Sequence, residues 1–467
     1  MPLTSEIAHR SPVSVRLTAS PEKDCSPSRS SRRISTQCAD CACYLSAFSP
    51  SSSDFHLSAP IFYALELTPL CNNRCLGCSN VFISHEDKPT RRGQEAHPPL
   101  DAAAWRAILE RIAPYAHSLK ITGGEPTLHP QFKEIVAEIN RRGIPFTLFT
   151  NARWQNPQEV ITLLRASPAC TGLLVSLHGA TAASHEAFSS VPGSFQETLR
   201  NVQLAVEAGL VVAISTIITH WNYAEVEDIV CLAWRLGAEQ VVFGRYAGLP
   251  LPTIEPTEEQ LKHAVQEVEQ MREAGEKIKL GNCIPHCFIP NSSAGCLAGI
   301  AYCAVDPWGN MRPCTHDGLL CGNLLEQTVE ELWLGNKMKS WREFLPTPCA
   351  GCPALDNCKG GCQATARQVS GIDPLMRVPL EAPLSQEKVT LTFYEGLRPK
   401  GFYSLLQEDF GFVLVCRDQI APLFPEAQSV VEVCKGTLTL RQIEESFGTK
   451  ALDLIGSLYR YGFIEMV

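Results

Sequence analysis

The sequence predicts an α/β protein built on a parallel sheet, and three observations support this fold class. Short apolar runs alternate with helical patterns from Phe62 to about residue 275. The apolar runs have the length of buried strands, and repeated strand–helix units place successive strands parallel. Twenty-one cysteines occur in 467 residues, most of them in tight groups. We therefore expect a parallel sheet with helical crossovers that carries metal or iron–sulfur sites.

Six apolar runs are predicted strands, at residues 62–67, 118–122, 145–150, 172–177, 210–216 and 239–244. Apolar residues from Phe132 to Ile139 repeat at helical spacing, and another helix is predicted to begin near Asp101, whose carboxylate can cap it. Such a sheet can close into a partial barrel or stay open. In both cases ligands bind at the carboxyl ends of the strands.

Composition excludes several classes of protein. The formal net charge of −9 disfavours a nucleic-acid partner, which requires a basic surface. No apolar run approaches the roughly 18 residues of a membrane-spanning helix. The start of the sequence does not resemble a signal peptide, so we expect a cytoplasmic protein. Because the cytosol keeps thiols reduced, the cysteines are not expected to form a disulfide framework.

The texture of the sequence predicts five segments. Residues 1–58 are rich in Ser, Pro and Arg and are expected to be disordered. The strand–helix core covers 59–280, and a cysteine-dense, loop-rich region covers 281–370, where we expect metal to organise the core more than apolar burial does. A linker at 371–388 leads to a small C-terminal domain at 389–467, whose size and order of strand-like and helical segments are typical of a winged helix.

Cys71, Cys75 and Cys78 lie directly after the first predicted strand, with the spacing C-x3-C-x2-C. This spacing places three thiolates on one tight loop. On a four-iron cluster, three thiolates leave one iron with an open coordination position that can bind a small molecule. A zinc loop or three unconnected thiols are the alternatives.

The later strand ends carry further candidate ligand contacts. Gly123 and Gly124 follow the second strand and can allow a ligand to approach the backbone closely. Glu125 can accept hydrogen bonds from an ammonium group. Polar or charged residues follow the later strands at Asn151, Ser176, His178 and Arg245. We expect Asn151, Ser176 and Arg245 among the cofactor contacts, Arg245 through a carboxylate, although packing or turn roles remain open for these polar residues.

Residues 62–280 resemble the radical S-adenosylmethionine (SAM) superfamily in the C-x3-C-x2-C loop and in the GGE motif on the next strand. The resemblance implies a partial (β/α)6 TIM-like barrel and a [4Fe–4S] cluster on Cys71, Cys75 and Cys78, whose open iron binds SAM. It also implies reductive cleavage of SAM to a 5′-deoxyadenosyl radical that removes a hydrogen atom from the substrate. A flavodoxin- or ferredoxin-type protein would supply the electron.

The same resemblance implies roles for individual residues. Gly123, Gly124 and Glu125 would line the site of the SAM amino group, and Ser176 would approach the ribose. One departure is visible, because the family usually has an aromatic residue just before the third cysteine and this chain has Gly77.

The downstream cysteines follow the pattern C-x12-G-x4-C and then C-x2-C-x5-C-x3-C. Zinc is one interpretation of such a cysteine-rich region. The pattern resembles the SPASM extension of radical SAM enzymes, which holds auxiliary [4Fe–4S] clusters. That resemblance implies a first auxiliary cluster on Cys296, Cys303, Cys314 and Cys362. It implies a second on Cys349, Cys352 and Cys358.

The second cluster lacks an obvious fourth ligand. The family has another cysteine shortly after the last group, whereas the next one here is Cys416. The cluster could have an open iron, which could bind a substrate thiolate, or it could take Cys283, Cys287 or Cys321.

Residues 389–467 resemble, more weakly, the PqqD-like domain that binds leader peptides. Such a domain binds an extended peptide by adding it as a strand to a sheet edge. A stabilising role and DNA binding are the alternatives, and acidic residues outnumber basic ones here, which disfavours phosphate contacts.

The predicted function is therefore radical SAM modification of a precursor peptide, with formation of a thioether or carbon–carbon crosslink or a related oxidative change. Maturation of a protein side chain, as in sulfatase maturation, or of a cofactor precursor is a second possibility. A non-catalytic iron–sulfur sensor is a third. The expected cofactors are the SAM-binding [4Fe–4S] cluster, one or two auxiliary clusters and SAM, and the expected partners are the peptide and the electron donor.

Overall fold

The computed structural model describes residues 33–38, 55–81, 98–290, 296–377 and 389–467. Its central sheet contains six parallel strands that lie side by side in chain order. They are β2 (Phe62–Glu66), β3 (Ser118–Thr122), β4 (Phe146–Thr150), β5 (Cys170–Ser176), β6 (Val212–Ile218) and β7 (Gln240–Arg245). Each strand overlaps one of the predicted apolar runs. The predicted α/β fold with a parallel sheet is confirmed.

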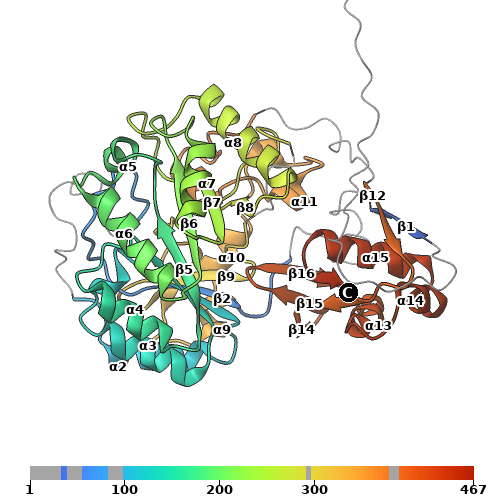
Figure 1. The fold of residues 1–467 in the computed structure, drawn as a ribbon. Helices are drawn as coiled ribbons and strands as arrows, with labels where there is room; N and C mark the ends of the chain where they lie inside the picture. The colour runs from blue at the N-terminus through green and yellow to red at the C-terminus, as the bar shows by residue number, and fades with distance from the viewer. Residues whose placement is uncertain (1–32, 39–54, 82–97, 291–295, 378–388) are drawn as a thin grey trace, which may run out of the picture.

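Helices connect successive strands and cover one face of the sheet (Figure 1). They are α2 (Ala102–Ile112), α3 (Phe132–Arg142), α4 (Pro157–Arg165), α5 (Ala182–Ser189), α6 (Ser194–Glu207), α7 (Val226–Arg235) and α8 (Glu258–Glu273). As expected, the Asp101 carboxylate caps α2 by accepting the Ala104 N–H at 2.8 Å. The apolar stripe of α3 is buried in the main core.

The other face of the sheet is less covered. Leu119 and Phe146 alternate with half-buried residues, and they pack with the helices in the core. Lys120 and Phe149 belong to the half-buried set, which points away from the helices because side chains alternate along a strand. The half-buried residues therefore form the second face of the sheet, which the crossover helices do not cover.

Four short strands extend the sheet on both sides. β8 (Ile278–Leu280) pairs with β7, and β9 (Tyr302–Val305), β10 (Asn310–Arg312) and β11 (Gly322–Asn323) continue beyond β2. The described strands form an open sheet with β8 and β11 at its edges, as a partial barrel requires.

Apolar burial contributes to the core of the cysteine-rich region. β9 runs parallel to β2, and its Cys303 and Val305 are completely buried. Trp333 of α9 (Val329–Trp333) and Trp341 of α10 (Asn336–Arg342) are also buried. The remaining helices of this region are α11 (Leu355–Cys358) and α12 (Gln363–Gln368).

The predicted small C-terminal domain of strands and helices is present. Its elements are β12 (Val389–Tyr394), β13 (Pro399–Gly401), β14 (Ser404–Glu408), β15 (Gly411–Cys416), β16 (Gln419–Leu423), α13 (Gln428–Val433), α14 (Leu440–Phe447), α15 (Thr449–Arg460) and β17 (Ile464–Met466). β15 is buried on both faces: Leu414 lies in the domain core, whereas Val413 and Val415 pack against Leu57 and Ile61 below the central sheet. The domain is thus docked by apolar contacts.

The N-terminal segment contains a strand that sequence analysis did not predict. β1 (Arg33–Cys38) pairs antiparallel with β12, far along the chain (Figure 1). Residues 1–32 and 39–54, also part of the predicted disordered segment, lie outside the described residues. From Phe55 the chain packs beneath the sheet.

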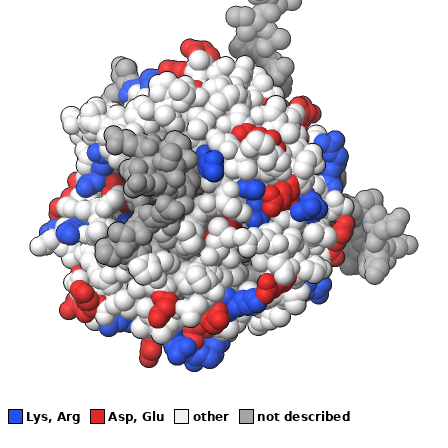
Figure 2. Space-filling model, turned by 90° about the vertical axis from the view of Figure 1, so that its left-hand side faces the viewer, with Lys and Arg blue, Asp and Glu red and all other residues white. Residues whose placement is uncertain are grey.

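The surface carries charges of both signs. On the face shown in Figure 2, Lys and Arg alternate with Asp and Glu without an extended area of one sign. Within the described residues, none of the helices combines the length and apolarity needed to cross a bilayer.

Candidate active site and iron–sulfur sites

The three cysteines of the C-x3-C-x2-C motif lie on the loop that follows β2. Cys71, Cys75 and Cys78 are half-buried, and the Cys71 sulfur accepts the Asn73 N–H at 3.4 Å. Burial, and then the neighbouring Cys75, raise the pKa of the Cys71 thiol, because negative charges on adjacent sulfurs repel. A cationic cluster would relieve this repulsion, so the donor set fits an iron–sulfur ligand loop.

A hydrogen-bond network from the end of β4 holds this loop. The Asn151 side chain donates to Asn72 Oδ1 at 2.7 Å, and its Nδ2 lies 3.8 Å from Cys71 Sγ. Arg153 Nη1 donates to the Asn72 carbonyl at 2.7 Å and to Asn73 Oδ1 at 2.8 Å. Sequence analysis missed Arg153, although its position two residues after a predicted site residue is a usable signal.

The two glycines of the GGE motif allow the backbone after β3 to pack against the segment that leads to the cysteine loop. Gly123 has a φ of +140°, and a Cβ there would lie 2.6 Å from the Thr68 carbonyl oxygen. A Cβ on Gly124 would lie 2.1 Å from the Leu70 carbonyl oxygen. The close approach that we expected for a ligand is thus already required by the protein's own backbone.

Glu125 is completely buried and joins the ends of two strands. Its carboxylate accepts hydrogen bonds from Thr127 Oγ1 at 2.7 Å, Thr150 Oγ1 at 2.9 Å and the Asn151 N–H at 2.8 Å. Burial raises the pKa of Glu125. Contact with the SAM amino group remains a prediction for this residue.

Apolar side chains fill the space around Gly77, where the family usually has an aromatic residue. A Cβ at this position would lie 2.4 Å from Ile254 Cδ1 and 2.8 Å from Phe188 Cε2. Together with Tyr246 these residues form a small apolar cluster against Cys75. An aromatic contact to the loop is therefore supplied from elsewhere in the chain.

The end of β5 carries Ser176, which is half-buried, and the buried His178 follows it. His178 Nδ1 accepts the Ile217 N–H at 3.1 Å, and burial lowers the pKa of His178 to about 3. This imidazole is neutral near pH 7 and ties β5 to β6. The ribose contact of Ser176 remains a prediction.

Arg245 does meet a carboxylate, but it is one from this chain. The guanidinium of Arg245 forms a buried ion pair with Asp373, and its Nε donates to the Cys283 carbonyl at 2.9 Å. Asp373 also accepts the Cys362 N–H at 2.8 Å. Arg245 is therefore directed toward the cysteine-rich region, where its side chain already has these partners.

Four cysteines are grouped beside this ion pair: Cys283, Cys296, Cys314 and Cys362. Cys283 and Cys296 are close enough for each side chain to shift the pKa of the other, and Cys314 and Cys362 lie within electrostatic range of Cys296. The Cys296 sulfur also accepts the Ala298 N–H at 3.3 Å. The first auxiliary cluster that sequence analysis predicted has four thiols available here.

Cys303, predicted as a ligand of that cluster, is not in the group. It lies on β9, completely buried in the apolar core, and its cysteine neighbour is Cys321. The resemblance to the SPASM extension implied Cys303 as the fourth ligand. In the structure Cys283, on the loop after β8, is the cysteine that lies beside Cys296, and we propose it as the fourth thiol of this group.

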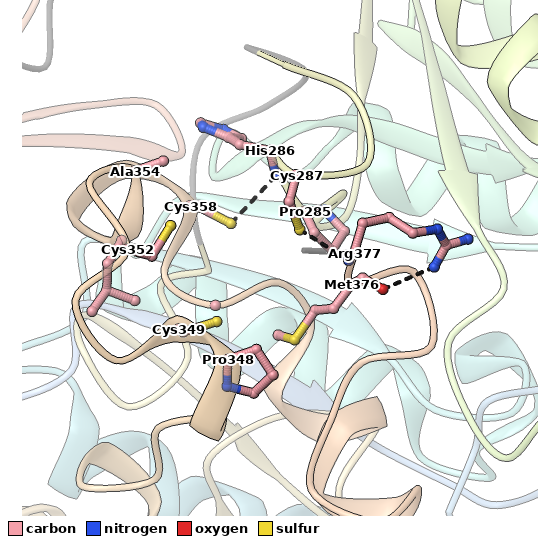
Figure 3. A pocket seen from close by; sticks show the side chains of 12 residues that line it. Pro285, His286, Cys287, Pro348, Cys349, Cys352, Ala354, Cys358, Met376 and Arg377 are labelled. Atoms are coloured by element: carbon pink, nitrogen blue, oxygen red, sulfur yellow. Dashed lines mark hydrogen bonds between the residues drawn. The ribbon is translucent and has the colours of Figure 1, made fainter. Parts of the chain in front are cut away.

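A second group of four cysteines lines one pocket: Cys287, Cys349, Cys352 and Cys358 (Figure 3). The pocket contains about 370 Å³ not filled by protein atoms, part of it open to solvent. Among the described residues, no three His, Cys, Asp or Glu side chains converge as tightly as ligands of a single metal ion. Two observations support an iron–sulfur cluster at this second group. The four cysteines share one pocket, and backbone N–H groups donate to the sulfurs of Cys287 and Cys358.

Comparisons with known proteins identify the family. Residues 65–233 match the model of the Radical SAM superfamily, and residues 296–353 match SPASM, the iron–sulfur cluster-binding domain. The chain is 31% identical over 356 residues to the mycofactocin maturase MftC of Mycobacterium ulcerans, covering 71% of this chain and 92% of that protein. The chain belongs to the radical SAM superfamily.

This radical SAM enzyme has other relatives. It is 29% identical over 346 residues to the AdoMet-dependent heme synthase of Methanosarcina barkeri, covering 67% of this chain and 94% of that protein. It is 26% identical over 350 residues to the PqqA peptide cyclase of Xanthomonas euvesicatoria, covering 69% of this chain and 89% of that protein. Streptococcus suis SuiB bound to S-adenosylmethionine shares the fold, with a TM-score of 0.55 at 18% identity, covering 68% of this chain and 77% of SuiB. The predicted cofactors, SAM and [4Fe–4S] clusters, are confirmed at the level of the family.

Proposed function

We propose that this radical SAM enzyme oxidatively modifies a ribosomally made precursor peptide, by forming a thioether or carbon–carbon crosslink or by a related change. The observation that carries the proposal is the similarity to a mycofactocin maturase and to a PqqA peptide cyclase. A docked C-terminal domain of strands and helices supports a leader-bearing substrate, since sheet edges bind extended peptides.

When bound, the SAM-binding cluster and SAM supply a carbon-centred radical that can remove a hydrogen atom from an unactivated position. The chain's residues position this chemistry. Asn151 and Arg153 hold the cysteine loop, and Phe188 and Tyr246 shield it with apolar surface. The rigid loop fixes where the cleaved bond would lie relative to the substrate.

The substrate side chain is proposed to lie on the half-buried face of the sheet. Lys120 points from β3 into this face, 5.0 Å from the ring centre of Tyr302 and 5.9 Å from that of Phe149. A mixed aromatic and polar surface suits a peptide side chain. The auxiliary-cluster cysteine Cys296 is near enough to influence Lys120 electrostatically. Electrons released from the substrate would therefore have a nearby acceptor site.

The leader is proposed to bind the C-terminal domain by strand addition at β12. In the structure β12 pairs with β1 in antiparallel register, from Arg33 opposite Tyr394 to Cys38 opposite Val389. Among the described strands, β1 is the sole partner of β12. The pairing supports this edge as one that accepts an extended segment.

We propose that the reaction takes place in the cytoplasm and that a flavodoxin- or ferredoxin-type protein donates the electron.

The test is anaerobic incubation of the reconstituted enzyme with SAM, a reductant and a peptide encoded beside its gene. A crosslink predicts formation of 5′-deoxyadenosine and loss of about two hydrogens from the peptide mass. Solvent deuterium uptake without oxidation would indicate epimerisation instead. Cys75→Ala should form no 5′-deoxyadenosine. If the intact enzyme also forms none, a sensor role is favoured.

Modification of a porphyrin-type cofactor precursor is the second candidate. The similarity to AdoMet-dependent heme synthase favours this candidate, because the match covers 94% of that protein. An iron-porphyrin precursor offered in place of the peptide distinguishes the two. A mass change in the porphyrin, with none in the peptide, would replace the first proposal.

A further inference from the structure

The second cysteine group draws its members from two distant parts of the chain. Cys349, Cys352 and Cys358 belong to the C-x2-C-x5-C motif, whereas Cys287 comes from the turn after β8. In Figure 3 the two segments face each other across the pocket, with Pro285, His286 and Cys287 opposite Cys349. The turn is closed by the Phe288 N–H, which donates to the Pro285 carbonyl at 2.9 Å.

Backbone N–H groups are directed at sulfurs on both sides of the pocket. The Arg377 N–H donates to Cys287 Sγ at 3.3 Å. The His286 N–H, from the turn, donates to Cys358 Sγ at 3.5 Å. The Cys287 turn thus contacts one of the motif sulfurs directly. Such N–H···S contacts stabilise ligating thiolates and tune iron–sulfur clusters.

The other cysteines that sequence analysis offered as fourth ligand lie elsewhere. Cys283 does not line this pocket and neighbours Cys296 in the first group. Cys321 neighbours Cys303. Cys416, the next cysteine after the motif, is buried in the core of the C-terminal domain. Of these residues only Cys287 lines the pocket.

We propose that Cys287 is the fourth protein ligand of the second auxiliary [4Fe–4S] cluster, together with Cys349, Cys352 and Cys358. It replaces the later cysteine that this chain lacks. All four irons then have a protein thiolate, so this cluster transfers electrons and has no open iron for a substrate thiolate. The inference rests on family membership and is independent of the peptide substrate.

The assignment also fixes how the two auxiliary sites are spaced. The short segment 283–287 supplies one thiol to each group, and so does the segment 358–362. The two segments pack closely: a Cβ on Gly361, which has a φ of +72°, would lie 2.9 Å from Pro285 Cγ and 2.8 Å from Asp373 Oδ2. Two rigid, mutually packed segments hold the sites at a constant separation, as electron transfer between them requires.

The test uses the full-length chain carrying Cys71→Ala, Cys75→Ala and Cys78→Ala, which removes the SAM-binding cluster and its own open iron. In this background we expect about eight irons per chain, four for each auxiliary cluster, and an EPR spectrum that added thiol or cyanide leaves unchanged. Adding Cys287→Ala should open one iron. The reduced spectrum should then respond to added thiol, or oxidation should yield a three-iron signal with loss of about one iron.

The matched control is Cys321→Ala, which removes a cysteine outside both groups and should behave like the background. Cys287→Ser should retain iron with an altered spectrum, because oxygen replaces sulfur. If Cys287→Ala keeps about eight irons and a ligand-insensitive spectrum, the proposal is wrong.

A second measurement does not depend on the variant's folding. Native holoenzyme is alkylated with iodoacetamide under anaerobic conditions and analysed by mass spectrometry. Cys287 should be protected until iron is chelated, whereas Cys231, which is exposed, should react at once. Equal labelling of Cys287 before and after chelation would overturn the assignment.

Discussion

Arg245, at the end of β7, forms a buried ion pair with Asp373, which lies beyond the cysteine-rich region. Through the Cys362 N–H and the Cys283 carbonyl, the pair also contacts the two segments that carry auxiliary-site cysteines. It therefore joins the parallel sheet to the iron–sulfur region. Asp373 falls in the segment that sequence analysis took as a linker, but it is completely buried.

Replacing Asp373 with Asn should leave the Arg245 charge buried without a partner. We expect the free energy of unfolding to fall by about 3–5 kcal/mol, measured by anaerobic chemical denaturation. Asp409→Asn, at an exposed position, should change it by less than about 0.5 kcal/mol. The double variant Arg245→Met/Asp373→Leu should recover most of the loss. Equal stability of Asp373→Asn and Asp409→Asn would contradict the role of the pair.

Arg153 is predicted to position the SAM-binding loop. Arg153→Gln removes the donors to the Asn72 carbonyl and to Asn73, so cluster occupancy and 5′-deoxyadenosine formation should fall by roughly 10–100-fold. Arg165→Gln, on the exposed end of α4, is the control. The readouts are iron content and 5′-deoxyadenosine rate. A normal iron content and a normal 5′-deoxyadenosine rate in Arg153→Gln would show that the loop keeps its geometry without the hydrogen bonds from Arg153.

Gly124→Ala should disturb the cysteine loop through the backbone. The added methyl group would meet the Leu70 carbonyl oxygen at 2.1 Å, which side-chain movement cannot relieve. We expect loss of the SAM-binding cluster with retention of auxiliary iron, seen as about four fewer irons per chain. Gly318→Ala, which has open space around it, should keep all of them. Full occupancy in Gly124→Ala would mean that the two segments can separate without cost.

Removal of β1 should expose the β12 edge. If the leader binds there, a chain lacking residues 1–38 should bind leader peptide several-fold more tightly than one lacking residues 1–32, which retains β1. Fluorescence anisotropy with a labelled leader measures the difference. The same affinity in both truncations would place the leader on another surface.

Two buried histidines predict a pH-dependent stability. Burial lowers the pKa of His178 to about 3 and that of His185 to about 4, whereas both titrate near 6.5 when unfolded. The unfolded state therefore gains protons first, and the free energy of unfolding should fall as the pH drops below about 6.5, by up to about 1.4 kcal/mol per pH unit for each histidine.

Urea denaturation from about pH 7 to about pH 5 tests this expectation. His185→Gln should reduce the slope, and His263→Gln, with an exposed side chain, should not. An unchanged slope in His185→Gln would assign the pH dependence to groups other than His185.

Local patterns in the sequence determined the strands, the helices, the cysteine loop and the family. Buried strands and amphipathic helices are set by the order of apolar residues over short stretches, and the spacing of Cys71, Cys75 and Cys78 within one loop needs no distant contact. The cysteine-rich region was also recognisable, because most of its motif is contiguous. The overlap of β2 to β7 with predicted runs reflects this locality.

Only the tertiary structure decided which distant groups meet. Cys283 and Cys287 are brought to their partners by the turn after β8, Arg153 reaches across from β4 to the loop after β2, and Arg245 finds Asp373 far along the chain. The resemblance to the SPASM extension implied Cys303 as a ligand, but Cys303 lies on β9 and is buried in the apolar core. The physical reason is that sequence spacing determines which cysteines of one loop can bind the same cluster. For cysteines from separate segments, the packing of strands and turns determines which of them lie close together.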